Sequence, residues 1–335
     1  MASKYLTIVE ETAGSYGTYT QSNASTTMKI LDESINTTRE DLNSVTVERW
    51  TSTRTEGFFR SSGDFNVLVD PVVWPNLLVY FMGDPSTANP AGSVYVHTFK
   101  MGNDESVGAT GLKSFSTKIG SGIEKDRLFH GCFINSLTVD CVNREVVSST
   151  VSINGNGHEK LVTAGTPTWA HYTQSYLTFA SASAMTIGGT DRLSTSPTIE
   201  AFRFEATRGF DTDVYVLGNK YLAHMIPSGE VTVSGSMDFT FKSQDEHERF
   251  LSSVGSDETS TQTGFAIRLG LDGATITDNH KYGIRFYLPD VNYQQSNIDV
   301  RGRDRIVQTV NWKANYKESA ASAATIIVRN TTATY

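Results

Sequence analysis

The chain has 335 residues, of which 38% are hydrophobic, and a formal net charge of −8. This length predicts two globular domains, and the apolar content excludes wholesale disorder. The acidic balance also argues against a protein that grips nucleic acid, because such proteins carry a basic excess.

Neither a membrane segment nor a secretion signal is predicted. No apolar run approaches the roughly 18 residues that a transmembrane helix needs, and residues 1–6 lack the apolar core of a signal peptide. We therefore expect no membrane association and a product that stays where it is made.

Strands dominate the first half of the chain. Residues 45–50 and 150–154 alternate between apolar and polar, as half-buried strands do. A short helix is predicted within 71–82, with Asp70 as N-cap and Pro71 at the first helical position. Its buried face is expected to consist of Trp74, Leu77, Leu78 and Phe81, with Gly83 ending the helix.

The second half has the same character. Strand patterns recur at 202–206, 239–241 and 306–312. A second short helix is predicted within 244–254, where Ser243 and Glu246 form a capping box. Its narrower apolar face comprises Phe250, Leu251 and Val254, and Gly255 follows. Residues 166–196, rich in Ser, Thr, Ala and Gly, are interpreted as a connector.

Three glycines recur at one constant offset. Gly57, Gly63 and Gly83 of the first half correspond to Gly229, Gly235 and Gly255 of the second. The predicted fold is therefore mainly β, with two tandem β-sandwich or barrel domains, each flanked by one short α-helix. The first domain covers 1–165 with an N-terminal arm, and the second covers 197–335 with a C-terminal tail. A unit present twice favours ring building, because each copy can occupy an equivalent place around an axis.

Motifs for catalysis and metal binding are missing from the sequence. The seven histidines are scattered, without zinc-ligand spacing, and no nucleophile elbow is present. We expect no enzyme activity, no catalytic residue, no cofactor and no metal ion. The densest basic patch, Arg301, Arg303 and Arg305, includes Asp304 and lacks interleaved aromatic residues. It favours an inter-subunit salt-bridge network over DNA contact.

Three segments resemble the tail tube proteins of long-tailed bacteriophages. They are residues 10–18, the stretch from Gly57 to Gly83, and residues 131–139, which run on into 146–155. The resemblance implies a β-sandwich or barrel with one flanking helix, in a structural virion protein whose rings stack into a hollow tube. The simplest family members place six single domains in a ring, so this doubled chain implies three copies per ring. A second domain that decorates the outside of a six-membered ring is the alternative.

The resemblance also implies partners and a location. These are further copies of the chain, the tail terminator, baseplate and tape-measure proteins, and double-stranded DNA in transient passage, within a virion tail assembled in the host cytoplasm. An acidic lining would let phosphates pass, and Asp41 and Asp213, which share the repeat offset, are candidate lumen acids. Rival interpretations are a capsid decoration or baseplate protein, a carbohydrate-binding adhesin, and a hydrolase whose site is drawn from distant residues.

Overall fold

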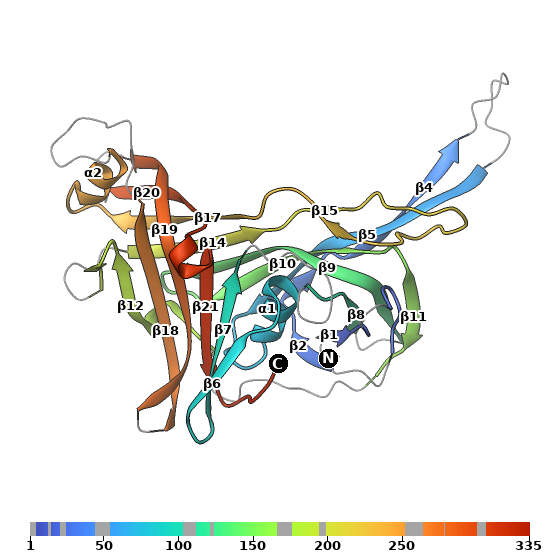
Figure 1. Ribbon diagram of the computed structural model, residues 1–335, viewed down its shortest axis with the longest axis horizontal. Helices are drawn as coiled ribbons and strands as arrows, with labels where there is room; N and C mark the ends of the chain where they lie inside the picture. The colour runs from blue at the N-terminus through green and yellow to red at the C-terminus, as the bar shows by residue number, and fades with distance from the viewer. Residues whose placement is uncertain are drawn as a thin grey trace.

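The computed structural model describes residues 5–12, 15–20, 25–43, 54–102, 112–120, 124–165, 176–193, 199–251, 264–277, 279–299 and 306–335. Within these ranges the protein is mainly β (Figure 1). The first half contains β1 (Tyr5–Glu10), β2 (Ser25–Lys29), β3 (Asp32–Glu33), β4 (Asn36–Asn43), β5 (Arg54–Leu68), β6 (Ser86–Ala91), β7 (Val94–Met101), β8 (Phe115–Gly120), β9 (Lys125–Val142), β10 (Ser148–Gly155) and β11 (Glu159–Thr163).

The second half contains β12 (Ala182–Ile187), β13 (Thr190–Asp191), β14 (Ile199–Thr207), β15 (Phe210–Asp211), β16 (Ile226–Pro227), β17 (Thr232–Thr240), β18 (Phe265–Thr277), β19 (His280–Asp299), β20 (Val307–Ala314) and β21 (Ala324–Asn330). The helices are α1 (Pro75–Met82), α2 (Asp245–Leu251) and the 3-10 turns η1 (Phe179–Ser181) and η2 (Glu318–Ala320). Neither α-helix of the described chain is long and apolar enough to cross a membrane.

Eight strands form one antiparallel layer. Their order is β4, β5, β10, β9, β14, β17, β20 and β19, and each pairs with the next. The two longest strands, β9 and β19, continue into a second layer. There β9 pairs with β8 and β11, whereas β19 pairs with β18 and β21. The two halves therefore share one order of paired strands. In the first half it is β5–β10–β9–β8–β1, and in the second half it is β17–β20–β19–β18–β12.

Each of the two long strands carries a bulge at a corresponding position. On β9, Ser136 and Ile134 pair with consecutive residues of β10, which leaves Asn135 without an opposite residue. On β19, Gln295 and Tyr293 pair with consecutive residues of β20, which leaves Gln294 in the same situation. A bulge bends a strand and increases its twist. The bend therefore lies where each long strand passes from the first layer to the second.

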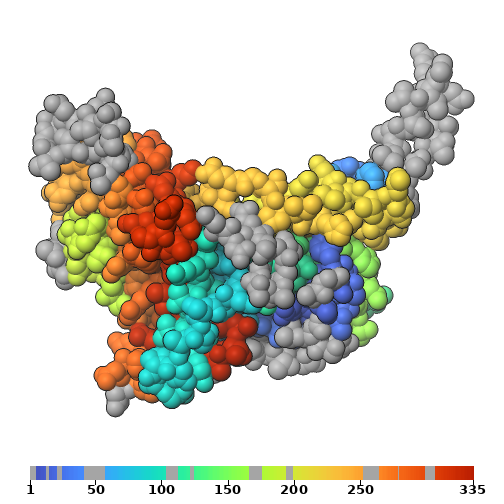
Figure 2. All heavy atoms as spheres, viewed as in Figure 1, coloured from blue at the N-terminus to red at the C-terminus, as the bar shows by residue number. Residues whose placement is uncertain are grey.

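Two strand pairs join the halves of the chain. The first is β9–β14, in which residues 136–142 pair with 201–207. The second is β7–β21, which pairs residues 95–101 with 324–330. The hairpin of β6 and β7, inserted between α1 and β8, thereby reaches the last strand of the chain. Figure 2 shows this hairpin, in cyan, beside the red C-terminal strand. The sheets of the two halves are consequently continuous.

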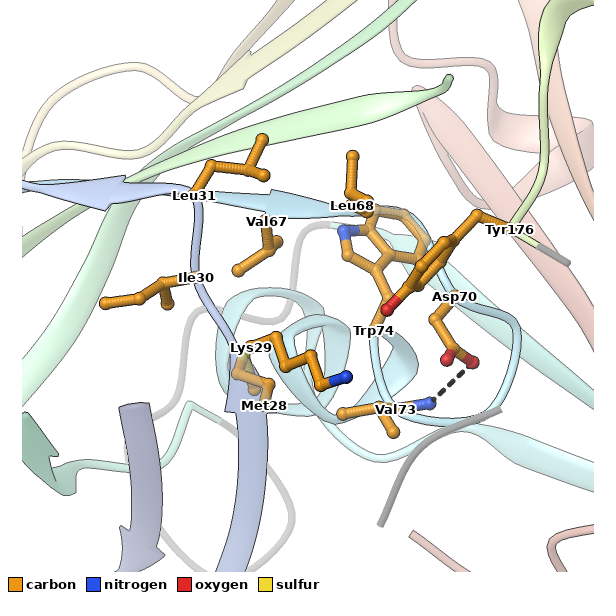
Figure 3. Close-up of a pocket in the computed structure, with 10 residues that line it drawn as sticks. All are labelled: Met28, Lys29, Ile30, Leu31, Val67, Leu68, Asp70, Val73, Trp74 and Tyr176. Atoms are coloured by element: carbon orange, nitrogen blue, oxygen red, sulfur yellow. Dashed lines mark hydrogen bonds between the residues drawn. The ribbon is translucent and has the colours of Figure 1, made fainter. Parts of the chain in front are cut away.

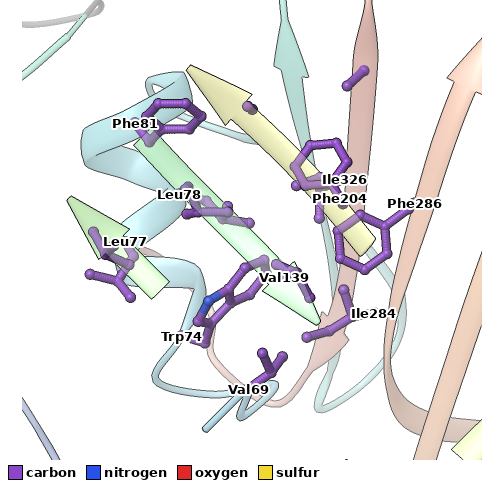
Figure 4. Close-up of a cluster of buried hydrophobic side chains, with 14 of the residues drawn as sticks. Val69, Trp74, Leu77, Leu78, Phe81, Val139, Phe204, Ile284, Phe286 and Ile326 are labelled. Carbon is purple, nitrogen blue, oxygen red and sulfur yellow. The ribbon is translucent and has the colours of Figure 1, made fainter. Parts of the chain in front are cut away.

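The buried side chains form one large cluster with members from both halves. Trp74, Leu77, Leu78 and Phe81 are all buried in it, beside Val139, Phe204 and Phe286 (Figure 4). The helix begins at Pro75, later than the sequence predicts, and residues 71–74 form a turn. In that turn the Asp70 carboxylate accepts a hydrogen bond of 2.7 Å from the Val72 N–H. Pro75 suits the first helical position, where a missing N–H has no cost.

Helix α2 lies within its predicted range of 244–254, of which residues 252–254 lie outside the described part of the chain. Phe250 and Leu251 are half-buried, while Val254 and Gly255 lie outside the described residues. Its buried residue is Glu246, which accepts hydrogen bonds from the Tyr293 hydroxyl at 2.7 Å, from the Arg249 Nε at 3.2 Å and from Arg192. Arg192 follows β13, within the stretch interpreted as a connector. That stretch also contains β12, which pairs with β18.

Two of the repeated glycines allow close packing inside strands. A Cβ on Gly235 would lie 2.0 Å from the Arg203 carbonyl oxygen and 2.4 Å from the Trp312 ring. A Cβ on Gly63, where φ is +152°, would lie 2.6 Å from the Ile35 Cα. Of the other repeated glycines, Gly57 lies within β5, Gly229 precedes β17, and Gly83 ends α1 by donating to the Val79 carbonyl at 3.0 Å.

Candidate functional site

One face of the eight-stranded layer is polar, and neither α-helix of the described residues packs against it. Strands β10 and β20 alternate strictly between half-buried and buried residues. Residues that lie directly opposite each other on paired strands share a face, and the strand registers place the half-buried and exposed residues of this face in four rows. The rows, together called the polar face, are Asp64–Ser152–Ser136–Thr207, Asn66–Thr150–Thr138–Glu205–Ser234–Lys313, Asp140–Arg203–Ser236–Asn311–Gln295 and Asp238–Thr309–Asn297.

Side chains on the polar face hold one another in place. The Arg203 guanidinium lies between two carboxylates, with Nη1 3.0 Å from Asp238 Oδ2 and Nε 3.6 Å from Asp140 Oδ1. Thr309 Oγ1 donates to Asp238 Oδ1 at 2.8 Å. Partial burial raises the pKa of Asp140, and the nearby Arg203 opposes that rise. The arrangement fixes the position of Arg203 and neutralises its charge.

The charge balance of the polar face is acidic. Asp64, Asp140, Glu205 and Asp238 supply carboxylates, whereas Arg203 and Lys313 supply the positive charges. Lys313 Nζ also lies 3.2 Å from Glu230 Oε1. A shallow depression of about 460 Å³ opens on this face between Thr138, Arg203, Glu205, Ser234 and Lys313. Hydroxyl, amide and carboxylate groups therefore dominate what a neighbouring solute would meet.

A second pocket lies elsewhere, at the beginning of α1 (Figure 3). It measures about 210 Å³ and is lined mostly by apolar side chains from β2, β5 and the turn before α1. Met28, Val67 and Trp74 form much of its wall, and Asp70 and Lys29 lie at its border. No group of three or more metal-ligating side chains occurs in the part of the chain that is described.

A long segment of the second half crosses onto the first. We call residues 208–231, which include β15 and β16, the arm; Figure 1 shows it, in yellow, running along β5. The Phe59 N–H donates to the Lys220 carbonyl at 3.0 Å, and the Tyr215 hydroxyl donates to the Phe59 carbonyl at 3.2 Å. The rings of Phe58 and Tyr215 lie 4.3 Å apart. The arm thus reinforces the β9–β14 pairing.

The predicted lumen acids do not belong to the polar face as defined. Asp213 lies in the arm, where its Oδ1 is 2.5 Å from Arg60 Nη2. Asp41 lies on β4 opposite Glu56, and its side chain is outside the described part of the structure. Arg301, Arg303 and Arg305 also lie outside the described residues. The alternation within 201–207 and 232–240 indicates which acidic residues of these strands point to the polar side, but only the strand order shows that they share a face.

The carboxylate of Glu11 has a structural role. It accepts hydrogen bonds from Gly17 N at 2.9 Å, Ser114 Oγ at 2.7 Å, Ser116 Oγ at 2.7 Å and Gly131 N at 2.8 Å. A buried carboxylate needs such donors to offset the loss of its hydration. Glu11 therefore fastens the segment after β1, which belongs to the 10–18 stretch that resembles tail tube proteins, to β8 and β9.

Acidification is expected to destabilise the fold through His130. Burial, with contributions from His158 and Lys160, lowers the pKa of His130 to about 4, whereas an unfolded histidine has a pKa of about 6.5. The unfolded chain therefore takes up a proton that the folded chain refuses. This contribution to stability is complete above pH 6.5 and is lost as the pH falls towards 4. The urea concentration at the unfolding midpoint should fall between pH 7.5 and pH 5.0, and this fall should be smaller in a His130→Phe variant than in the native chain. An equal fall in both proteins would contradict the assignment.

The fold and the polar face define a mainly β protein in which β4 and β19 end the eight-stranded layer of the described residues. The family model described as "Phage tail tube protein" matches residues 2–314. The chain therefore belongs to the phage tail tube protein family. A search of curated proteins gives no match. Its role is structural: it builds the tail tube of a virion together with further copies of itself and other tail components.

Proposed function

We propose that three copies of this chain close into a ring with six pseudo-equivalent units, and that such rings stack into the tube. The units are residues 1–165 and 197–335, joined by 166–196. In the ring, β4 of each chain pairs with β19 of the next. The observation that supports this most is the β9–β14 pairing. Strand β4 occupies the position in the first half that β14 occupies in the second, and β19 occupies the position in the second half that β9 occupies in the first.

The internal seam also supplies a register for the seam between chains. Phe204 of β14 is opposite Val139 of β9. Ile35 corresponds to Phe204, since the register places it beside Gly63 as Phe204 is beside Gly235. Ile298 corresponds to Val139, because the strand registers lead from each of them, across one intervening strand, to equivalent positions of the repeat. That position lies on β17 for Ile298 and on β5 for Val139. Ile35 is therefore expected opposite Ile298, which places Thr38 opposite Gln295 of the next chain.

The alternative, a six-membered ring with the second unit outside it, receives less support. The second unit continues the sheet of the first through β9–β14 instead of packing against its exterior. Edge strands with unpaired backbone groups recruit further strands, and closure into a barrel removes those edges. In a closed ring, the backbone groups at the outer edges of β4 and β19 pair with each other.

The polar face would line the channel in such a ring. The other side of the layer is packed against α1 and the second layer, so the polar face is the side able to border open space. Its carboxylates repel DNA phosphates, and its hydroxyl and amide groups keep bound water. Double-stranded DNA would pass without an adhesive site. Tail terminator, baseplate and tape-measure proteins would meet the stacked rings, which assemble in the host cytoplasm.

A double cysteine variant tests the ring directly. In the proposed register Thr38 and Gln295 face each other across the seam as a pair that is not hydrogen-bonded, where Cα atoms lie about 4.5 Å apart. The native Cys132 and Cys141 are buried and do not compete. Mild oxidation of assembled Thr38→Cys, Gln295→Cys protein should give covalent dimers and trimers, with nothing larger, in denaturing gels.

The matched control moves one cysteine along the same face. Thr38→Cys with Asn297→Cys places the two thiols about two residues out of register, beyond the reach of a disulfide. Cross-linking of the control as fast as the test pair would contradict the register. A ladder that extends to six chains would contradict the three-membered ring.

A further inference from the structure

Strand β11 presents an open edge at the rim of the first half. It pairs with β9 through residues 159–163, and the residue registers of the described strands give it no second partner. In Figure 1 it lies on the opposite side of the molecule from α2. Its Leu161 side chain is 58% exposed. Open edges of this kind recruit further strands.

The last strand of the chain, β21, occupies the corresponding place in the second half. Along the chain, β11 comes after β10 and β21 comes after β20, the last layer strand of each half. Each then pairs with the first part of a long strand, β11 with β9 and β21 with β19. The outer edge of β21, however, is filled by β7 from the first half over seven residue pairs. The seam between the halves thus consists of two strand pairs, β9–β14 and β7–β21.

The hydrogen-bond pattern identifies the backbone groups that β11 leaves open. His130 N donates to the His158 carbonyl at 3.1 Å, so the pair 130–158 is hydrogen-bonded. Because antiparallel pairs alternate, Lys160 and Val162 direct their backbone groups towards β9. Leu161, with Glu159 and Thr163 on either side, directs its N–H and carbonyl away from β9.

We propose that β11 accepts a strand from the neighbouring copy of this chain in the same ring, the copy whose β19 pairs with β4. This inference depends on the proposed ring. The seam between chains would then repeat both strand pairs of the seam within the chain, with β19–β4 matching β9–β14 and strand addition on β11 matching β7 on β21. The apolar Leu161 side chain would be covered by the added strand.

A proline at Leu161 separates this contact from folding. Leu161→Pro removes an N–H that points outwards and leaves the β9-facing groups of Lys160 and Val162 intact, which an edge strand tolerates. The midpoint concentration for ring assembly, measured by sedimentation, should rise about tenfold, because a lost backbone hydrogen bond and a blocked edge each weaken association. Leu161→Thr, which keeps the N–H, should assemble within about threefold of the native chain.

Two further measurements decide what a failure means. Hydrogen exchange of the Leu161 amide should be fast in the monomer and slow in isolated rings. Fast exchange in rings, or protection that arises only in stacked rings, would overturn the β11 proposal while leaving the ring itself intact. The Thr38→Cys, Gln295→Cys cross-link reports on the ring separately: if it fails in otherwise native protein, the proposed ring is wrong, whatever Leu161→Pro does.

Discussion

Replacing Leu78 by aspartate is expected to prevent folding. Leu78 lies on α1 with no exposed surface, among the apolar side chains of Figure 4. The change removes the packing of a leucine, which costs about 2–5 kcal/mol, and adds the cost of burying a carboxylate without a partner. The sum is comparable to the whole stability of a typical domain, about 5–15 kcal/mol. Circular dichroism and thermal melting of the purified protein would measure the loss.

The same chemical change at the surface is the control. Leu217, in the arm, is fully exposed, so Leu217→Asp should melt within a few degrees of the native chain. Leu78→Met, which nearly conserves volume, should cost less than about 1.5 kcal/mol. A folded and assembled Leu78→Asp protein would show that α1 does not pack as described.

Replacing Ile298 by proline is expected to abolish ring formation while the monomer still folds. Phe241 N donates to the Ile306 carbonyl, so the backbone groups of Ile306 and, by alternation, Gln308 face β17. The backbone groups of Thr309 then face β19, so its partner Asn297 directs its own backbone N–H and carbonyl towards β20. The N–H of Ile298 must therefore point to the open side of β19. Proline removes that donor and blocks the approach of another strand.

Size-exclusion chromatography coupled to light scattering would show Ile298→Pro as a monomer at concentrations where the native chain assembles. Ile298→Val keeps the N–H and the β-branched shape, so it should assemble normally. Rings of Ile298→Pro with native stability would mean that β19 is not a seam strand. A monomer melting point that falls by more than about 5 °C would show that the proline disturbs β19 itself.

The local patterns of the sequence predicted elements well where the signal is contained in one segment. Alternation predicted the strands that became β10, β14 and β20, and the spacing of Trp74, Leu77, Leu78 and Phe81 predicted the buried face of α1. The start of α1 was predicted too early because the Asp70 carboxylate caps a turn that precedes the helix. The packing of α2 was harder to predict, because its buried residue is the charged Glu246, whose distant partners are Tyr293 of β19 and Arg192, which follows β13.

The polar face could not be predicted because it depends on which strands are neighbours. Asp140, Glu205 and Asp238 lie on β9, β14 and β17, and only the cross-half pairing brings these strands together. The arm was missed for a related reason: residues 208–231 have little strand pattern and gain their order by lying along β5. The bulge at Asn135 has no clear local signal, since the residues around it read as one uninterrupted strand.

Carrying the two halves of the sheet in one polypeptide also changes the kinetics that assembly must follow. The β9–β14 contact forms within the chain, so its partners meet at a high effective concentration that dilution does not lower. In the proposed ring, half of the six seams therefore exist before any encounter, and closure needs three bodies to meet instead of six. Because the two kinds of seam are encoded by different residues, either could be strengthened by mutation while the other stays weak enough to correct errors.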